Sequence, residues 1–261
     1  MKYTYAESGG QPISWDGQTH LLCVGTTGSG KSALLNSLLW SIFVDHPNTE
    51  SSALVLNPKR VGFTWIAASP RVCLFNNAAD MESIYQGISD EMMRRYTALE
   101  TGEISESELK PIYVFQDEMA ALLSGSLIDQ RNVKSIKEKL QELLILARAS
   151  KIFVCAFTQT ALAEYVAGTL TRANFSSTII MHVSNSSELS MAANLSADDV
   201  SGSMEPTNFI RGEVLASTEQ GKAFVRGMSF YHSPDELLLA KPILQSAEPA
   251  DFSYLSKRGL L

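Results

Sequence analysis

Charged side chains are scarce in this sequence of 261 residues, since they make up only 19% of it. That share is low for an isolated soluble monomer and leaves room for surfaces that pack against other subunits. No apolar stretch reaches the roughly 18 residues that a membrane-spanning helix needs, and residues 1–10 are polar and aromatic rather than signal-like. The net charge of -7 argues against a protein that coats nucleic acid indiscriminately, although it leaves room for a local basic patch.

Cysteine is also rare. The three cysteines, Cys23, Cys73 and Cys155, each lie within an apolar run, and so few exclude a disulfide scaffold. Buried free thiols are the expected state, which indicates a reducing cytoplasm. The sequence has no Cys-x-x-Cys pair and no histidine-rich cluster, so it gives no indication of a structural metal site.

Continuously apolar runs alternate with helix-like segments along the chain. The runs are residues 20–24, 53–57, 71–75, 112–116, 152–157 and 178–183, and the expected helices are residues 31–44, 80–99, 133–149 and 188–194. Strands without polar alternation belong to a sheet that is covered on both faces, and intervening helices indicate parallel crossovers. The fold class is therefore α/β.

The end of the chain has a different pattern. Residues 212–215 and 222–230 read as two strands joined through residues 217–221, a β-hairpin at the edge of the sheet. The chain beyond Pro234 is loosely patterned. Because no repeat or flexible linker divides the sequence, we expect one domain over residues 1–261, with a core of about 10–230 and an extension of 231–261.

A glycine-rich loop follows the apolar run 20–24 and opens a predicted helix. It has the spacing of a phosphate-binding P-loop and consists of Gly25, Thr26, Thr27, Gly28, Ser29, Gly30, Lys31 and Ser32. Glycines let backbone N–H groups surround a phosphate, and the helix N-terminus adds its positive end. Lys31 is expected to reach the β- and γ-phosphates, and the Ser32 hydroxyl to bind Mg²⁺. A chance glycine-rich turn is the alternative, but the strand–loop–helix order disfavours it.

Two further strand ends carry polar groups. Asp117 and Glu118 follow the run 112–116, where an aspartate supports the Mg²⁺ shell and the next carboxylate polarises the attacking water. This pair argues for hydrolysis rather than binding alone. Gln159, after the run 152–157, is a candidate sensor of the γ-phosphate. The alternative for Thr158-Gln159 is a polar strand end that caps the next turn. The guanine-reading Asn-Lys-x-Asp motif is absent, which favours ATP with Mg²⁺.

Taken together, these residues resemble the motor domain of the FtsK/SpoIIIE family of hexameric DNA translocases. The resemblance extends from about residue 10 to about residue 230. Its further matching segments are Asn57-Pro58-Lys59, Glu-Met-Met-Arg-Arg-Tyr (91–96), Ala-Arg-Ala-Ser-Lys-Ile (147–152), Phe-Thr-Gln (157–159) and Leu-Thr-Arg-Ala-Asn (170–174). It implies a RecA-like P-loop NTPase core with a mostly parallel sheet flanked by helices, to which the C-terminal hairpin is added.

The resemblance also implies roles for individual residues. Lys31 and Ser32 would hold phosphate and Mg²⁺, Asp117 the metal, Glu118 would be the catalytic base and Gln159 the sensor. Arg148 corresponds to an arginine finger that acts on the ATP of a neighbouring subunit, so a homo-oligomer, a hexamer, is expected. The alternative for Arg148 is a cation at a helix C-terminus that interacts with the helix dipole.

The chain departs from the family in its charges. Asn57 replaces an aspartate, and Thr160 replaces an arginine of the DNA-facing loops. Between Lys151 and Arg211 the only basic side chain is Arg172, which is the DNA-contact candidate, against five acidic ones: Glu164, Glu188, Asp198, Asp199 and Glu205. Because phosphate contacts dominate non-specific DNA affinity, we expect DNA binding that is weak and depends on assembly.

Three functions remain open. The leading one is an ATP-driven DNA translocase that moves plasmid or chromosomal DNA in conjugative transfer or segregation, with a membrane-bound or relaxase partner of a transfer apparatus. The second is an ATPase like those of type VII secretion, which act on protein segments and suit the basic-poor loops. The third is a non-motor ATP-binding assembly module, against which the Asp117-Glu118 pair argues.

Overall fold

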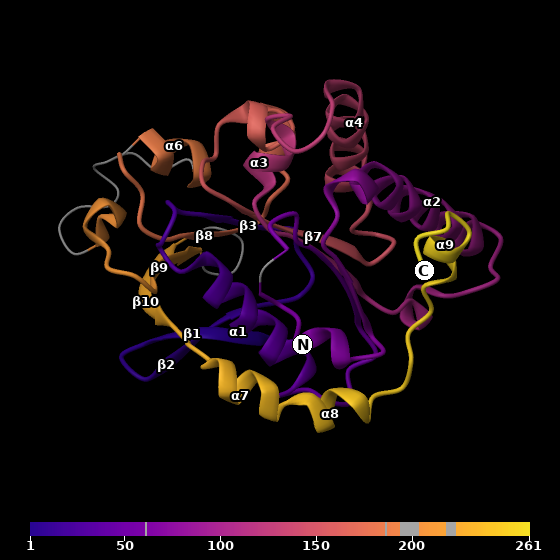
Figure 1. Cartoon of the computed structure of the whole chain (residues 1–261), viewed down its shortest axis with the longest axis horizontal. Coiled ribbons are helices and arrows are strands. Elements are labelled where there is room, and N and C mark those ends of the chain that lie inside the picture. Colours follow the sequence, from indigo (N-terminus) through magenta and orange to yellow (C-terminus); the bar gives the residue numbers. More distant parts are fainter. Residues whose placement is uncertain (61, 186, 194–203, 218–222) are drawn as a thin grey trace.

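The computed structural model describes residues 1–60, 62–185, 187–193, 204–217 and 223–261, which form one ten-stranded sheet in the order β2-β1-β10-β9-β8-β3-β7-β6-β4-β5 (Figure 1). The strands are β1 (Tyr3–Ser8), β2 (Gln11–Trp15), β3 (Leu21–Val24), β4 (Ser52–Leu56), β5 (Val72–Phe75), β6 (Ile112–Gln116), β7 (Ile152–Thr158), β8 (Ser177–Ile180), β9 (Glu213–Ser217) and β10 (Phe224–Ser229). Neighbouring strands from β8 to β5 in this order pair in parallel, and the remaining pairs are antiparallel. The α/β class with a mostly parallel sheet is confirmed.

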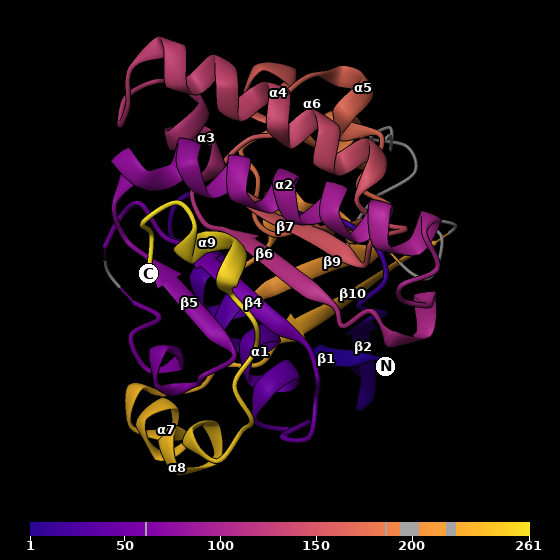
Figure 2. The same ribbon diagram turned by 90° about the vertical axis from the view of Figure 1, so that its right-hand side faces the viewer.

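Helices cover both faces of the sheet (Figure 2). They are α1 (Lys31–Phe43), α2 (Met81–Glu100), α3 (Met119–Leu123), α4 (Gln130–Leu146), α5 (Thr169–Arg172), α6 (Ser187–Ala193), α7 (Pro234–Leu239), α8 (Lys241–Gln245) and α9 (Ser253–Ser256). Side chains of a strand alternate between faces, so Leu21 and Cys23 join the core under α1, whereas Leu22 and Val24 join the core under α2 and α4. Both sets are buried, which is why these strands read as unbroken apolar runs.

The expected central strands and helices are present with shifted ends. β8 ends at Ile180 rather than residue 183. α4 begins at Gln130, three residues early, because the Asp129 side chain accepts hydrogen bonds from the backbone of Arg131 and Asn132 and caps the helix. In the helix expected over residues 188–194, the last residue, Asn194, lies outside the described residues.

The C-terminal hairpin is not at the edge of the sheet, and that part of the expectation is wrong. β9 and β10 pair antiparallel as expected, but β10 also pairs with β1, and β2 continues the sheet. A side chain on Gly227 of β10 would begin 2.4 Å from the Glu7 backbone oxygen, so only glycine allows β1 to come this close. Of the residues expected to join the hairpin, 217–221, all but Ser217 lie outside the described residues.

The extension beyond residue 230 contains short helices that the sequence did not reveal. Leu237 and Leu244 from α7 and α8 pack into the core under α1, whereas Leu255 of α9 packs into the core under α2. Ser233 and Glu236 form a reciprocal capping box at the start of α7. The division into a core of about 10–230 and an extension of 231–261 stays a prediction, and β1 begins at Tyr3, before that core.

Among the described residues, no helix is both long enough and apolar enough to span a bilayer.

Candidate active site

The glycine-rich loop connects β3 to α1 and is held between two neighbouring strands. The Gly25 backbone N–H donates to the Thr158 carbonyl at the end of β7 (3.2 Å), and the Thr26 N–H donates to the His182 carbonyl after β8 (2.8 Å). The Ser29 carbonyl accepts from the Gly212 N–H (2.9 Å). The loop is therefore fixed from three sides before any ligand enters.

Two of its glycines are required by backbone geometry. Gly28 and Gly30 have φ values of 87° and 112°, in the left-handed region that other residues rarely adopt. Gly30 immediately precedes α1, so these turns bring the loop's N–H groups toward the N-terminus of a 13-residue helix. Such a terminus attracts anions.

Lys31 lies inside the loop. Its Nζ donates to the carbonyl oxygens of Gly25 (2.6 Å) and Thr26 (3.0 Å), and the residue is only 5% exposed. Burial lowers the pKa of the Lys31 amine. Ser32, the next residue, is exposed at the first turn of α1. The contacts of Lys31 with a phosphate and of Ser32 with a metal stay predictions.

Asp117 follows β6 and is fully enclosed, with an exposed fraction of 2%. Burial, followed by the charge of Glu118, raises its pKa to about 6. Its Oδ1 is buried without a hydrogen-bond partner in the described part of the chain. A buried carboxylate oxygen with no partner is suited to a hard cation, so Asp117 together with the Ser32 hydroxyl fits Mg²⁺. A bound Mg²⁺ would neutralise phosphate charge at this position.

Glu118 is the first residue before α3, in a left-handed backbone conformation (φ 52°), and is 3% exposed. Both of its carboxylate oxygens are occupied. Oε2 accepts a hydrogen bond from Gln159 Nε2 (2.8 Å), and Oε1 forms an ion pair with Lys59. Lys59 belongs to the Asn57-Pro58-Lys59 segment after β4 and was not among the expected site residues.

The alternative interpretation of Thr158-Gln159 applies to only one of the two residues. The Thr158 hydroxyl is buried and donates to the Thr160 carbonyl (3.0 Å), so it does cap the turn that follows β7. Gln159 instead extends toward Glu118, as a sensor residue near the catalytic base would. The sensor role itself stays a prediction.

Four adjacent strands supply this cluster. In the order β3, β7, β6 and β4, their carboxyl ends are followed by the P-loop, Gln159, Asp117-Glu118 and Lys59. The carboxyl edge of a parallel sheet is where α/β proteins bind ligands. The structure thus brings together every expected nucleotide-site residue except Arg148.

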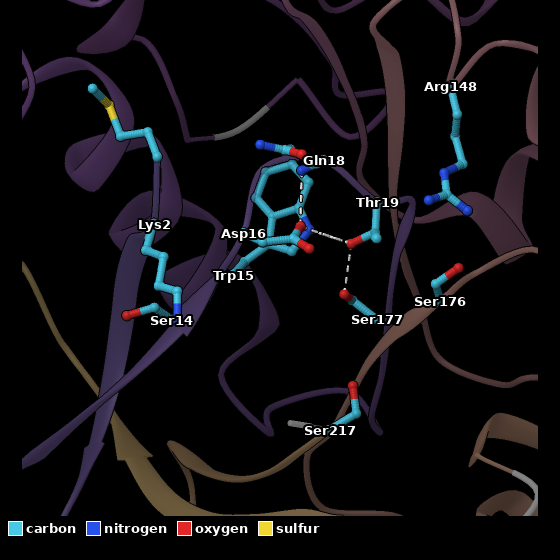
Figure 3. A pocket seen from close by; sticks show the side chains of 11 residues that line it. Lys2, Ser14, Trp15, Asp16, Gln18, Thr19, Arg148, Ser176, Ser177 and Ser217 are labelled. Carbon is cyan, nitrogen blue, oxygen red and sulfur yellow. Dashed lines mark hydrogen bonds between the residues drawn. The ribbon is translucent and has the colours of Figure 1, made fainter. Parts of the chain in front are cut away.

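Arg148 lies at the opposite edge, between the end of α4 and the start of β7. It lines a cavity of about 570 Å³ with Thr19 and Ser177, which precede β3 and begin β8 (Figure 3). The residue is exposed and forms no ion pair with the residues that the structure describes. Seven residues of β7 separate it from the carboxyl edge, which is about 20 Å at strand spacing. It therefore cannot reach the P-loop of its own chain.

Arg172 ends the short helix α5 and is partly buried. Its Nη1 donates to the Ala161 carbonyl (2.8 Å), so the DNA-contact candidate also supports the turn after β7. Glu188 of α6 supports the same turn, because it accepts from the Thr160 hydroxyl (2.8 Å) and the Ala161 N–H (3.0 Å). The acidic residues Asp198 and Asp199 lie outside the described residues.

A P-loop, a strand-end carboxylate pair and a parallel sheet together define a P-loop nucleoside triphosphatase. The model of the FtsK/SpoIIIE family matches residues 6–204. The chain therefore belongs to the FtsK/SpoIIIE family, whose members are ATPases. The match leaves β9 and β10 outside, so it ends earlier than the resemblance in the sequence indicated.

Individual relatives agree with this assignment. The chain is 28% identical to the DNA translocase FtsK of Tropheryma whipplei over 188 residues, which are 64% of this chain and 24% of that protein. It is 26% identical to that of Staphylococcus epidermidis over 202 residues, which are 69% and 24%. The chain thus spans about a quarter of the length of these curated relatives.

Solved structures share the fold. The pCW3 conjugation coupling protein TcpA, in a monomer form with ATPγS, superimposes with a TM-score of 0.76 at 22% identity, covering 94% of this chain and 70% of that chain. The cytoplasmic domain of the Thermomonospora curvata type VII secretion ATPase EccC gives 0.76 at 18% identity, covering 97% and 32%. At these identities the likeness concerns the fold alone.

Proposed function

We propose that this chain is the ATP-hydrolysing motor of a DNA translocase that works as a ring of identical subunits. Its cargo is plasmid or chromosomal DNA during conjugative transfer or segregation, where a membrane-bound or relaxase partner recruits it. The family assignment supports hydrolysis of ATP, the name of the FtsK relatives supports DNA as cargo, and the name of TcpA supports a part in conjugation.

One observation carries the ring assembly. Lys31, Asp117, Glu118 and Gln159 converge at the carboxyl edge of the sheet, whereas Arg148 is exposed at the amino edge of the same strands. Transfer of a phosphoryl group to water develops charge that an arginine stabilises. Because Arg148 does not reach the site of its own chain, we infer that it acts on the nucleotide of a neighbouring copy.

The positions of the clustered residues support the roles that we propose for them. Lys31 and the loop N–H groups bind the phosphates, and Ser32 and Asp117 hold Mg²⁺. Glu118 accepts a proton from the attacking water, with Gln159 fixing its orientation. The turn after Gln159 is hydrogen-bonded to Glu188 of α6. A movement of Gln159 at the nucleotide would therefore be passed on to α6 and the loops at the carboxyl edge.

A protein-translocating ATPase is the second candidate. The basic-poor segment between Lys151 and Arg211 favours it, because its only cation, Arg172, is bonded to the Ala161 carbonyl. The non-motor assembly module is disfavoured by Glu118, since a site that only binds ATP needs no buried base.

ATP turnover measured with and without duplex DNA separates the three functions. We expect the wild type to be stimulated by DNA and Glu118→Gln to have no turnover in either condition. Turnover that ignores DNA would favour the protein cargo, and no turnover in the wild type would favour the assembly module. Fluorescence anisotropy that detects no ATP-dependent DNA binding, even at low salt, would contradict the DNA assignment.

A further inference from the structure

Lys59 is the one cation beside the catalytic carboxylates, among the described residues, that the expected P-loop chemistry does not use. Its ammonium forms an ion pair with Glu118 Oε1, and its side chain is 46% exposed whereas that of Glu118 is 4% exposed. The half-exposed Lys59 side chain therefore reaches from the surface to a buried carboxylate. This arrangement differs from a surface ion pair, in which both partners are solvated.

The register of the sheet accounts for its position. β4 pairs in parallel with β6, with Leu56 opposite Gln116, so the residues just after these two strands lie side by side. Pro58 restricts the backbone between Asn57 and Lys59. Lys59 thus stands at the fourth strand end of the edge that carries the P-loop, Gln159 and Glu118.

The ion pair conflicts with the function of Glu118. A general base needs an accessible lone pair for the proton that it accepts. Here Gln159 occupies Oε2 and Lys59 occupies Oε1. Gln159 is a neutral donor that can remain while the base works, whereas the charged ammonium on Oε1 competes with the attacking water for that oxygen. Lys59 has a flexible four-carbon stem that can swing without moving the backbone.

We propose that Lys59 is a ligand of the terminal phosphate, which pairs with Glu118 until a triphosphate enters and then moves to the γ-phosphate. The proposal rests on the proposed ATP hydrolysis. A γ-phosphate carries more negative charge than a carboxylate and three acceptor oxygens, so it competes for the ammonium. The transfer frees Glu118 Oε1 only when the substrate is present. ADP has no γ-phosphate, so with ADP the ion pair persists.

The test compares a triphosphate with a diphosphate. Affinities for ATPγS and ADP, each with Mg²⁺, are measured by titration calorimetry for the wild type, Lys59→Gln and Lys59→Arg. Glutamine still donates a hydrogen bond to Glu118, so the buried carboxylate keeps a partner in Lys59→Gln. We expect this variant to bind ATPγS about tenfold more weakly and ADP within about twofold of the wild type. Lys59→Arg should keep ATPγS affinity within about threefold.

Lys110→Gln is the matched control. Lys110 is equally exposed, at 49%, and forms an ion pair with Glu50, but it precedes β6 at the other edge of the sheet. Its substitution should leave both affinities unchanged. ADP affinity also reports whether each variant has folded.

The outcomes separate the two proposals. Unchanged or tighter ATPγS binding in Lys59→Gln, or equal losses for ATPγS and ADP, would overturn the role of Lys59 and leave the proposed ATPase intact. If Lys59→Arg lost as much ATPγS affinity as Lys59→Gln, the contact with the γ-phosphate would not depend on the positive charge of Lys59, and the proposal would be wrong. A wild-type protein that binds no ATPγS would overturn the proposed function and, with it, this inference.

Discussion

Gln159 donates a hydrogen bond from Nε2 to Oε2 of Glu118 at 2.8 Å, and this bond connects the ends of β7 and β6. Glu118 is buried and Gln159 is exposed, so the amide reaches inward from the surface to orient the carboxylate. Because this bond holds one oxygen of the Glu118 carboxylate, it also fixes the direction in which the other oxygen points. The bond therefore positions the base that the proposed hydrolysis requires.

Substituting Gln159 should slow the chemical step more than it weakens binding. Without the amide, Glu118 is free to rotate away from the attacking water, and positioned general bases contribute about 10²–10⁴-fold to rates. We expect Gln159→Ala to lower kcat for ATP by at least tenfold and to change the ADP dissociation constant less than threefold. Steady-state turnover and nucleotide titration measure the two quantities.

Gln86→Ala provides the control for this substitution. Gln86 Nε2 also donates to a carboxylate at 2.8 Å, that of Asp90, but on the exposed surface of α2. Its loss should leave turnover unchanged. Equal turnover in the wild type and Gln159→Ala would show that Glu118 needs no orienting amide.

Asp117 makes stability depend on pH. Burial, and then the charge of Glu118, raises its pKa from 3.8 to about 6. The native state therefore holds the Asp117 proton more tightly than the unfolded state, so stability decreases as pH rises from about 4 to about 6. Above that range the buried charge costs roughly 3 kcal/mol. Asp117→Asn should raise the free energy of unfolding by roughly 2–3 kcal/mol at pH 8 and by about half as much at pH 5.

Urea denaturation of the nucleotide-free protein at the two pH values measures this difference. The same variant should lose ATP turnover, because an amide is a poorer ligand for Mg²⁺ than a carboxylate. A site that gains stability when its function is removed is a common consequence of buried functional charge. If Asp117→Asn were less stable than the wild type at pH 8, burial of the ionised Asp117 carboxylate would not be destabilising the folded protein.

Gly227 tests the close packing of β10 against β1. A methyl group there would meet the Glu7 backbone oxygen and Ile13 Cδ1 at 2.4 Å, and neither strand can move without breaking the ladder. Gly227→Ala should lower the free energy of unfolding by about 2 kcal/mol. In Gly87→Ala, within α2, the nearest atoms are the side-chain atoms Leu255 Cδ2 at 3.3 Å and Arg258 Cδ at 3.4 Å. Alanine also favours the helix, so stability should change by less than about 1 kcal/mol. Similar losses in both variants would contradict this difference in packing.

The sequence revealed the parts of the fold that depend on local patterns. Strands such as β6 and β7 are buried on both faces and therefore appear as apolar runs, and the P-loop follows from the spacing of its glycines. The β1–β2 hairpin was missed because β2 begins with exposed Gln11 and Pro12 and has only one buried residue, Trp15. The helices α7, α8 and α9 have only four to six residues each, too few to show a helical period.

The site divides in the same way. Asp117 and Glu118 follow directly from a strand that ends in two carboxylates. The ion pair between Lys59 and Glu118 joins residues far apart in the chain, and only the pairing of β4 with β6 brings them together. The separation of Arg148 from the P-loop similarly needs the direction of β7, which only the assembled sheet provides.

Arg148 gives the sharpest test of assembly. An arginine supplied to a neighbouring site contributes about 10³-fold or more to turnover without being needed to bind the nucleotide. Arg148→Ala should therefore abolish ATP turnover and keep ATPγS affinity within about threefold of the wild type. Arg131→Ala, which removes an exposed arginine from the start of α4, should change neither quantity.

Mixing two inactive variants distinguishes a neighbour's site from the chain's own. Lys31→Ala subunits have no working nucleotide site but keep Arg148. Arg148→Ala subunits keep the nucleotide site but lack the arginine. If Arg148 acts across the interface, a mixture regains turnover wherever an intact site faces an intact arginine, and the gain depends on the mixing ratio. If a mixture stayed as inactive as its components while wild-type turnover rose with protein concentration, subunits would assemble without exchanging this arginine. Arg148 would then be the cation at the C-terminus of α4 that the alternative interpretation describes.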